Sequence, residues 1–541
     1  MLVLANIVFS VLSVAFAFAI RHIINGATID TTVFAKEEGT KMIIDGSIAI
    51  GIIVLLQALF RIIIGGLTEH IAGRLDITFK SSLFATILSR KYSAINVYHS
   101  GELLNRLTSD VKIVSEGIVN VLPTAIAAIT RLLCAVAALI VLEPVFAIGF
   151  TVAGALVFLT IAIMRGKLKG LHKSAQTKDG VARSFMQECI ENLLAVKTFS
   201  VNDQINEKAT ALQEDSFRIK MKRKNYAVGG HTVYNFIFSA GYVFALIYGG
   251  IKILNGDIFY GDLSAILQLV NNVQVPFASL SNLLPTYYSM IASAERLMEI
   301  EQIDAETKET DKTENAVSEI KDMRSIVIDN VTFSYGRDTV LQNASLKVNR
   351  GDFIAVLGRS GIGKSTILKL LLGVYNVKDG ELYIETDGGK HNLDVYSRTV
   401  FSYVPQGNLL FSGTLKDNVA FIKADATDEE IEKALITSCA YDFVKELPDG
   451  LNTVVGENGT GLSEGQIQRI AIARALLCGA PVILLDEATS ALDDITEKQL
   501  LSNLKELQDV TVIIVSHRKQ VLSVCNRAVA VKNKRIEEVA V

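Results

Sequence analysis

The stretch FIAVLGRSGIGKSTILKLLLG, residues 353–373, decides how the C-terminal part of this chain folds. Its first residues are apolar and typical of a buried strand, and the residues at its end have the apolar periodicity of a helix. Between them lies the spacing G-x-x-x-x-G-K-S, at Gly358, Gly363, Lys364 and Ser365. Such a loop lets backbone N–H groups close around phosphates, while the lysine faces the β- and γ-phosphate oxygens and the serine hydroxyl faces Mg²⁺. The sequence therefore predicts a strand–loop–helix unit that binds a nucleotide.

The predicted phosphate cradle covers the whole loop and the first turn of the helix. N–H groups at a helix start have no partner within the helix, and the helix dipole favours an anion there. We therefore expect the nucleotide phosphates to contact Gly358, Arg359, Ser360, Gly361, Ile362, Gly363, Lys364, Ser365 and Thr366.

A second motif, PVILLDEATSALD at residues 481–493, predicts the part of the site that cleaves the nucleotide. The four apolar residues 482–485 are typical of a buried parallel strand. Asp486 at its end can hold Mg²⁺, directly or through water, and Glu487 can polarise the water that attacks the γ-phosphate. Together with the phosphate cradle, this motif predicts ATP hydrolysis.

Three single residues fit around these motifs. Tyr335, in FSYG, precedes the cradle and can stack on adenine; Gln406, in YVPQGNLLF, can reach Mg²⁺ and the attacking water; His517, after the apolar run VTVIIVS, can bond the γ-phosphate. Alone, each is more often structural, but their order and spacing around the motifs favour a role in the site. The predicted catalytic residues are Glu487, His517 and Gln406, and the predicted Mg²⁺ ligands are Ser365, Gln406 and Asp486.

The N-terminal half contains stretches that are long and apolar enough to cross a membrane. A bilayer core requires about 20 mostly apolar residues per helix. A single such stretch can be a buried soluble helix, but several in one block indicate a membrane domain. Six stretches qualify, at residues 1–24, 44–66, 119–142, 145–165, 230–254 and 263–291.

The connections between these stretches predict the orientation. The connections after the second and fourth stretches are long and rich in Lys and Arg, whereas 25–43, 143–144 and 255–262 are short and poor in them. Because positive loops stay in the cytoplasm, we expect the long connections and the C-terminal half to be cytoplasmic. The long connections also favour helix, so membrane helices two to five are predicted to continue into the cytosol as paired rods.

Two arginines, Arg61 and Arg131, lie inside the apolar block. A charge in lipid is costly and normally faces a partner, a cavity or the end of the bilayer. Either arginine can line a substrate path, or it can form a buried pair or lie on a helix that extends past the bilayer.

Composition and charge complete the domain assignment. The formal charge of −4 gives no reason to expect nucleic acid, and the scattered cysteines show no metal-ligand spacing. Residues 298–325 are charged and without periodicity, which is typical of a linker. We expect a transmembrane domain at 1–297, a linker at 298–325 and a nucleotide-binding domain at 326–541. The predicted fold class is multidomain: an all-α transmembrane domain of six helices with long cytosolic extensions, then an α/β P-loop ATPase domain.

The motifs together resemble those of the ABC superfamily, in particular an exporter-type half-transporter. GRSGIGKST, YVPQ, LSEGQIQR, ILLDEATSALD and VSH occur in the family's order, and the resemblance covers essentially the whole chain. HSGELLNRLTSDV and NLLAVKTFSVNDQINEK also resemble its coupling segments. Met1 leads almost directly into the first apolar stretch. We therefore expect that the amphipathic segment usual in the family is lost, or that the chain begins inside a longer product.

The resemblance implies that two nucleotide-binding domains work head to tail. The helix start at LSEGQ, the signature turn, would then contact ATP held by the partner's cradle through Ser463, Gly465 and Gln466, and Asp493 would contact the opposite subunit. The family's usual sequence is LSGGQ, so Glu464 is a departure. A carboxylate facing phosphate is repulsive, and we expect Glu464 to point away, towards the flank of the helix start.

The resemblance implies an integral membrane translocase of a bacterial plasma membrane, with ATP and Mg²⁺ as cofactors and a cytoplasmic nucleotide-binding domain. Its partners would be the lipid bilayer, a transported solute and a second half-transporter, identical or different. The leading function is ATP-driven export of an amphipathic small molecule, lipid or peptide by alternating access. Import of a metal-chelate type solute and an ATP-gated channel or regulatory membrane subunit are the alternatives.

Overall fold

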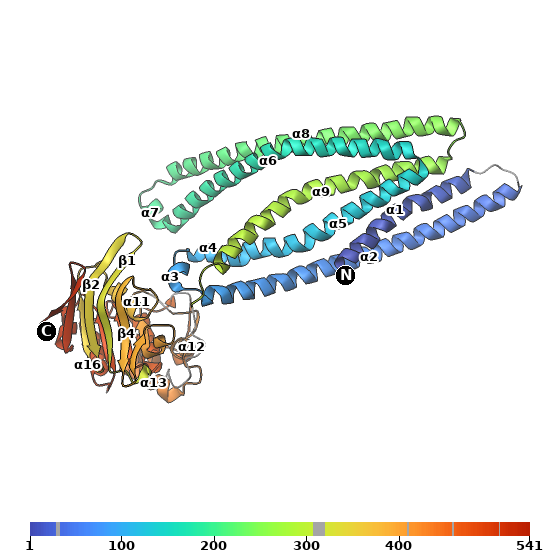
Figure 1. The fold of residues 1–541 in the computed structure, drawn as a ribbon. Helices are drawn as coiled ribbons and strands as arrows, with labels where there is room; N and C mark the ends of the chain where they lie inside the picture. Colours follow the sequence, from blue (N-terminus) through green and yellow to red (C-terminus); the bar gives the residue numbers. More distant parts are fainter. Residues whose placement is uncertain (29–32, 307–319, 408–409, 457–458, 508, 541) are drawn as a thin grey trace. The chain divides into compact units, whose positions relative to one another are not determined.

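The computed structural model describes residues 1–28, 33–306, 320–407, 410–456, 459–507 and 509–540 (Figure 1). The chain divides into two units: Met1–Ala85 with Ser100–Glu301, and Thr86–His99 with Gln302–Val541. Residues 86–99, which the sequence prediction placed in the membrane domain, thus group with the second unit. Within the predicted linker at 298–325, residues 307–319 lie outside the described residues, whereas residues 298–301 belong to α9 and Ser325 begins β1.

The first unit is built from long helices, which Figure 1 shows running beside one another. Helix α5 packs against α9, α1 packs against both, and α6 packs along α8. The long helices are α1 (Leu2–Ala27), α2 (Val33–Ser89), α5 (Val111–Leu142), α6 (Pro144–Glu191), α8 (Asn202–Leu254) and α9 (Tyr260–Glu301). The short elements are α4 (Ser100–Asn105), the π-helix η1 (Arg106–Asp110) and α7 (Leu193–Thr198).

These helices correspond to the six predicted apolar stretches. Among the described residues, 4 stretches are long and apolar enough to cross a membrane: Leu2–Ala27, Lys36–Ser89, Ser100–Leu142 and Asn202–Leu254. The predicted stretches 145–165 and 263–291 lie within α6 and α9.

For the fourth and fifth of the predicted membrane helices, the predicted paired rods are seen where α6 and α8 continue beyond their apolar parts. Charged side chains join the two helices there: Lys220 pairs with Asp179, and Lys178 Nζ lies 3.5 Å from Asp215 Oδ2. Exposed ion pairs of this kind contribute little stability. In this part of the α6–α8 contact they stand where the membrane segments have apolar contacts. The polar composition of this region is therefore compatible with a long helical hairpin.

One of the two intramembrane arginines has a partner on another helix. Arg131 on α5 donates from Nε and Nη2 to Asn272 Oδ1 on α9, at 2.9 and 2.6 Å. Asn272 in turn donates from Nδ2 to the Ser13 carbonyl on α1, at 3.2 Å. Arg131 therefore joins three packed helices, whereas Arg61 on α2 is exposed in the single chain.

The second unit is centred on a sheet with the strand order β12-β11-β3-β10-β9-β6. All neighbours are parallel except β11 and β12. Strands β9 and β10 are buried along their whole length, as expected for the centre of a parallel sheet. The strands are β3 (Phe353–Leu357), β6 (Phe401–Val404), β9 (Val482–Asp486), β10 (Thr511–Val515), β11 (Arg527–Lys532) and β12 (Arg535–Val539).

Both faces of this sheet are covered. On one face, α11 (Lys364–Leu371) and an antiparallel sheet of order β2-β1-β4-β5 enclose a core that includes Ile354, Ile367 and Ile513. On the other face, α15 (Glu464–Leu477) and α16 (Asp494–Lys505) pack on Ile483 and Val512. The antiparallel strands are β1 (Ser325–Tyr335), β2 (Asp338–Asn349), β4 (Asp379–Thr386) and β5 (Gly389–Asn392).

Smaller elements complete the unit. The start of α15 shares a separate apolar core with a group of short helices. The helices of this group are α12 (Leu415–Val419), α13 (Asp428–Thr437), α14 (Tyr441–Glu446) and η3 (Gly450–Asn452), beside the strand pair β7 (Gly413–Thr414) and β8 (Val454–Val455). The remaining elements are α3 (Tyr92–Ile95), η2 (Ser397–Val400) and η5 (Lys519–Ser523).

Candidate nucleotide site

The predicted cradle forms the turn between β3 and α11. Gly358, Gly361 and Gly363 have φ values of 153°, 76° and 111°, a region that other residues rarely adopt. A Cβ at Gly363 would lie 2.4 Å from Val340 Cγ1, so both the backbone conformation and the packing require glycine there. The glycines therefore determine the shape of the turn, as the motif predicted.

Lys364 is held at this turn by its own loop. Its Nζ donates to the carbonyls of Gly358 and Arg359, both at 3.1 Å, and only 4% of the side chain is exposed. Burial lowers the pKa of Lys364, because removing the ammonium from water disfavours its charge. The nearby carboxylates of Glu487 and Asp486 oppose this shift.

Ser365 and Asp486 provide adjacent oxygen ligands. Ser365 Oγ donates to Asp486 Oδ1 at 2.8 Å, and Asp486 is 2% exposed at the end of β9. Burial raises the pKa of Asp486, and its hydrogen bonds oppose that shift. Mg²⁺ prefers oxygen ligands and is commonly held by one or two carboxylates together with phosphates. This oxygen pair beside the cradle fits a Mg²⁺ ion that arrives with ATP.

The three predicted catalytic residues meet at one carboxylate. Glu487 Oε1 lies 2.9 Å from His517 Nε2 and 4.0 Å from Lys364 Nζ, and Gln406 Nε2 donates to Glu487 Oε2 at 2.7 Å. An ionised carboxylate only accepts, so the amide nitrogen of Gln406 faces Glu487 and its carbonyl oxygen remains available. That oxygen can serve a metal ion or water, as predicted for Gln406.

Glu487 adopts an unusual backbone conformation. Its φ is +51°, a left-handed value that is costly for a residue with a side chain, by about 1–3 kcal/mol. Its N–H donates to the Val515 carbonyl of β10 at 3.0 Å, which holds the strained residue in place. Strain that neighbouring strands maintain is common at functional sites.

Tyr335, the predicted adenine contact, lies in an aromatic cluster. Its ring packs edge-on against Phe333 and Tyr375, with centroid distances of 4.9 and 5.3 Å, and its hydroxyl lies 3.4 Å from Thr366 Oγ1. Tyr375 also packs against Tyr92 of α3, at 6.0 Å. The aromatic cluster therefore connects the edge of the cradle with α3.

The predicted signature turn begins α15. Ser463 is the N-cap: its Oγ accepts from the Gln466 N–H at 3.3 Å, and Gln466 Oε1 accepts from the Ser463 N–H at 2.9 Å. Glu464 is the first residue of the helix and is exposed, where a negative charge suits the helix dipole. Gly465 packs closely on the loop before α16, since a Cβ there would lie 2.9 Å from the Ala491 carbonyl oxygen.

Asp493 caps the next helix, α16. Its carboxylate accepts from the N–H groups of Ile495 and Thr496 and from Thr496 Oγ1. These hydrogen bonds lower the pKa of Asp493. The structure thus places the predicted residues in two groups, one around Glu487 and one at the starts of α15 and α16.

One residue of the first group was not predicted from the sequence. Tyr403, on β6, donates from its hydroxyl to Asp486 Oδ2 at 3.2 Å. Burial raises the pKa of Tyr403. The phenol therefore keeps its proton and can donate the hydrogen bond. Its position on the strand that leads to Gln406, three residues before that glutamine, is the signal in the sequence that points to it.

The cradle, the Ser365–Asp486 pair and the carboxylate at Glu487 define a P-loop nucleotide-binding domain, here joined to a helical membrane domain. The family model described as ABC transporter transmembrane region matches residues 1–277. The model described as ABC transporter matches residues 341–490. The chain belongs to the ABC transporter family: it is an integral membrane protein with an ATP-binding domain.

Relatives extend over most of the chain. The ATP-dependent lipid A-core flippase of Desulfotalea psychrophila is 29% identical over 542 residues, which cover 99% of this chain and 92% of the flippase. The Bacillus subtilis ATP-binding/permease protein YgaD is 30% identical over 450 residues, 81% of this chain and 76% of that protein. A solved bacterial Atm1-family ABC exporter with ATP bound shares the fold: the TM-score is 0.85 at 22% identity, over 100% of this chain and 95% of the exporter.

Lys364→Ala is expected to weaken ATP binding by about 10- to 100-fold, because a hydrogen bond to a charged group is worth about 1.5–3 kcal/mol. Equilibrium binding of ATP to the purified protein measures this. Lys378→Ala, which removes an exposed lysine of the same domain, should bind as wild type. An unchanged ATP affinity in Lys364→Ala would contradict the cradle.

Tyr403→Phe is expected to make Mg²⁺-dependent ATP binding more sensitive to acid. The lost hydrogen bond had lowered the pKa of Asp486, so the variant carboxyl takes up a proton at higher pH, and protons compete with Mg²⁺. As pH falls, the variant should require up to about tenfold more Mg²⁺ than wild type, and the two should converge at high pH. Mg²⁺ titrations of ATP binding across pH measure this, and coincident curves at every pH would refute it.

Proposed function

We propose that the chain is an ATP-driven exporter of an amphipathic compound that works as a dimer by alternating access. The observation that carries this proposal is the meeting of Lys364, His517 and Gln406 at the Glu487 carboxylate, beside the Ser365–Asp486 pair. A chain that only bound ATP would not require a carboxylate there. Because a membrane domain is part of the same chain, ATP hydrolysis can be coupled to conformational change in that domain.

In this proposal, each of the predicted site residues has a separate role in binding or hydrolysing ATP. The cradle N–H groups and Lys364 bind the phosphates, and Tyr335 packs on the adenine. Ser365, Asp486 and the Gln406 carbonyl would hold Mg²⁺, which would supply positive charge against the phosphates. Glu487 accepts a proton from the attacking water, and His517 donates to the γ-phosphate. Lys364 and His517 must then exchange their contact with Glu487 for phosphate oxygens, which leaves that carboxylate free to act as base.

The second group of residues supports the dimer. A capped helix start with an adjacent hydroxyl is a suitable anion site, and the cradle lies at a different helix start, that of α11. We infer that Ser463 and Gly465, with Gln466 fixing the turn, contact the ATP of the partner subunit, and that Asp493 faces the same interface. Two ATP molecules would then join the two domains, and hydrolysis would release them.

The membrane domain suggests the location and the substrate class. The basic connections favour a cytoplasmic nucleotide-binding domain, and the bacterial relatives favour the plasma membrane. The relative named as a lipid A-core flippase supports an amphipathic lipid as substrate. Arg131, whose guanidinium donates to the uncharged amide side chain of Asn272, is a candidate contact for an acidic headgroup.

Glu487→Gln is expected to bind ATP with near-normal affinity and to lose hydrolysis by about 10²–10⁴-fold. Glutamine keeps the shape of the side chain and can still accept from Gln406, but it cannot take a proton. ATP binding and phosphate release measure the two effects, with Glu506→Gln on the surface as the matched control. Near-normal hydrolysis would show that Glu487 is not the base.

The reconstituted chain is expected to move an amphipathic probe when ATP is added to vesicles whose nucleotide-binding domains face outwards. A headgroup-labelled fluorescent phospholipid should move from the outer to the inner leaflet, and Glu487→Gln should not move it. A panel that adds a lipophilic dye, a peptide and a metal chelate tests the substrate class. Movement in the reverse direction would indicate an importer, and ion conductance without accumulation would indicate a channel; either result would overturn the proposal.

A further inference from the structure

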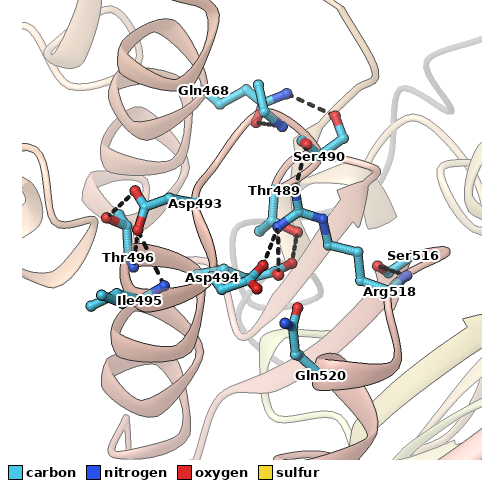
Figure 2. Close-up of polar contacts among 12 residues, drawn as sticks. Gln468, Thr489, Ser490, Asp493, Asp494, Ile495, Thr496, Ser516, Arg518 and Gln520 are labelled. Atoms are coloured by element: carbon cyan, nitrogen blue, oxygen red, sulfur yellow. Dashed lines mark hydrogen bonds and ion pairs between the residues drawn. The ribbon is translucent and has the colours of Figure 1, made fainter.

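The loop between β9 and α16, residues 487–493, connects the two groups of site residues. It begins at Glu487 and ends at Asp493, the N-cap of α16. Within it, the Ser490 N–H donates to the Glu487 carbonyl at 3.1 Å, and the Leu492 N–H donates to the Thr489 carbonyl at 3.2 Å. Figure 2 shows that side chains from other elements contact this loop from two sides.

Arg518 holds the loop from one side. It directly follows His517, and its Nη2 donates to the Ser490 carbonyl at 2.9 Å. Its Nη1 lies 2.9 Å from Glu497 Oε2 on α16. A planar guanidinium can make both bonds only in a narrow range of orientations. The contact therefore fixes the loop relative to the residue that carries the histidine.

The partner of Arg518 is an unusual one, because Glu497 is 0% exposed. Its second oxygen, Oε1, accepts from Thr489 Oγ1 at 2.7 Å, also within the loop. A buried ion pair seldom gives more stability than well-packed apolar residues would. What Glu497 and Arg518 add is therefore orientation: two loop residues are bonded to one rigid pair.

Gln468 holds the loop from the other side. It lies on α15, one turn after Gly465, and is 6% exposed. Its Nε2 donates to Ser490 Oγ at 3.1 Å, and its Oε1 accepts from the Ala491 N–H at 3.1 Å. The close packing of Gly465 on the Ala491 carbonyl adds a steric contact. The loop thus has direct contacts with the helix that begins at the signature turn.

We propose that Arg518 and Gln468 are positioning residues for ATP hydrolysis, which together hold loop 487–493 and so fix Glu487 relative to the signature turn of the same chain. The inference rests on the proposed function, in which Glu487 acts on one ATP and the signature turn contacts the other. The two contacts would then transmit a shift at one nucleotide to the other through the loop. Neither residue needs to touch ATP.

The test compares variants that remove these contacts with variants that retain them. Arg518→Met combined with Glu497→Gln removes the contact to Ser490 without leaving an unpaired buried carboxylate. Glu497→Gln alone is its matched control, since Arg518 keeps its bond to the Ser490 carbonyl. Gln468→Met removes both bonds at similar volume, and Gln520→Met alters an exposed neighbour that Figure 2 draws without a bond to the loop.

Three measurements decide the result: ATP affinity, the kcat of hydrolysis, and hydrogen exchange of the Ala491 amide. We expect the double variant and Gln468→Met to bind ATP within about twofold of wild type and to lose about 10- to 100-fold in kcat, since small displacements of a catalytic group have effects of that size. The Ala491 amide should exchange faster in Gln468→Met. Gln520→Met should retain wild-type kcat, and Glu497→Gln alone should lose less kcat than the double variant, because Arg518 keeps its bond to the Ser490 carbonyl.

Two outcomes would overturn the inference. One is a wild-type kcat in both variants. The other is a loss of ATP affinity and thermal stability in proportion to the loss of kcat, which would indicate a merely structural role. Glu487→Gln, assayed in parallel, separates this inference from the proposed function: normal hydrolysis by that variant contradicts the proposed function itself.

Discussion

The parallel pairing of β3, β10 and β9 is the constraint on which the nucleotide site depends. In register, Val515 lies beside Val356 on one side and Asp486 on the other. The chain leaves all three strands at the same edge of the sheet, so the cradle, His517 and Glu487 follow within bonding distance of one another. Buried apolar side chains on these strands favour this register, and the polar groups at the strand ends take the positions that follow.

Electrostatics explains why this edge of the sheet suits a phosphate with a metal ion. Burial lowers the pKa of Lys364 and raises the pKa of Asp486. Both shifts favour the neutral form of the side chain. A polyphosphate beside the ammonium and a divalent cation beside the carboxylate would reverse both shifts, since each would supply the opposite charge. The two ligands support each other in this way, and neither alone would satisfy both groups.

The sequence was sufficient to predict features that depend on residues close together in the chain. It was insufficient to predict contacts between strands and helices that are far apart in the chain. The cradle and the long helices follow from spacing and periodicity, which act within a few residues of the chain. The bonds from Tyr403 to Asp486 and from Gln468 to the loop at Ser490 depend on which strands and helices are neighbours. The same holds in the membrane domain: the cost of a charge in lipid identified Arg131, but only helix packing shows that Asn272 is its partner. The bond that Glu487, in its left-handed conformation, makes to Val515 of β10 likewise depends on which strands are neighbours.

In the proposed dimer, the start of α15 would contact a ligand held by another chain, and its local structure suits that role. The capping box uses the N–H groups of Ser463 and Gln466. The first N–H groups of a helix have no carbonyl partner within it, so those of Glu464 and Gly465 remain as donors at the turn. Ser463 Oγ accepts in the box, which leaves its hydrogen for donation. A negative residue at 464 stabilises the helix start through the dipole and opposes an approaching phosphate. Exposure of its flexible side chain to water reconciles the two effects, because solvent screens the repulsion more than it weakens the backbone donors.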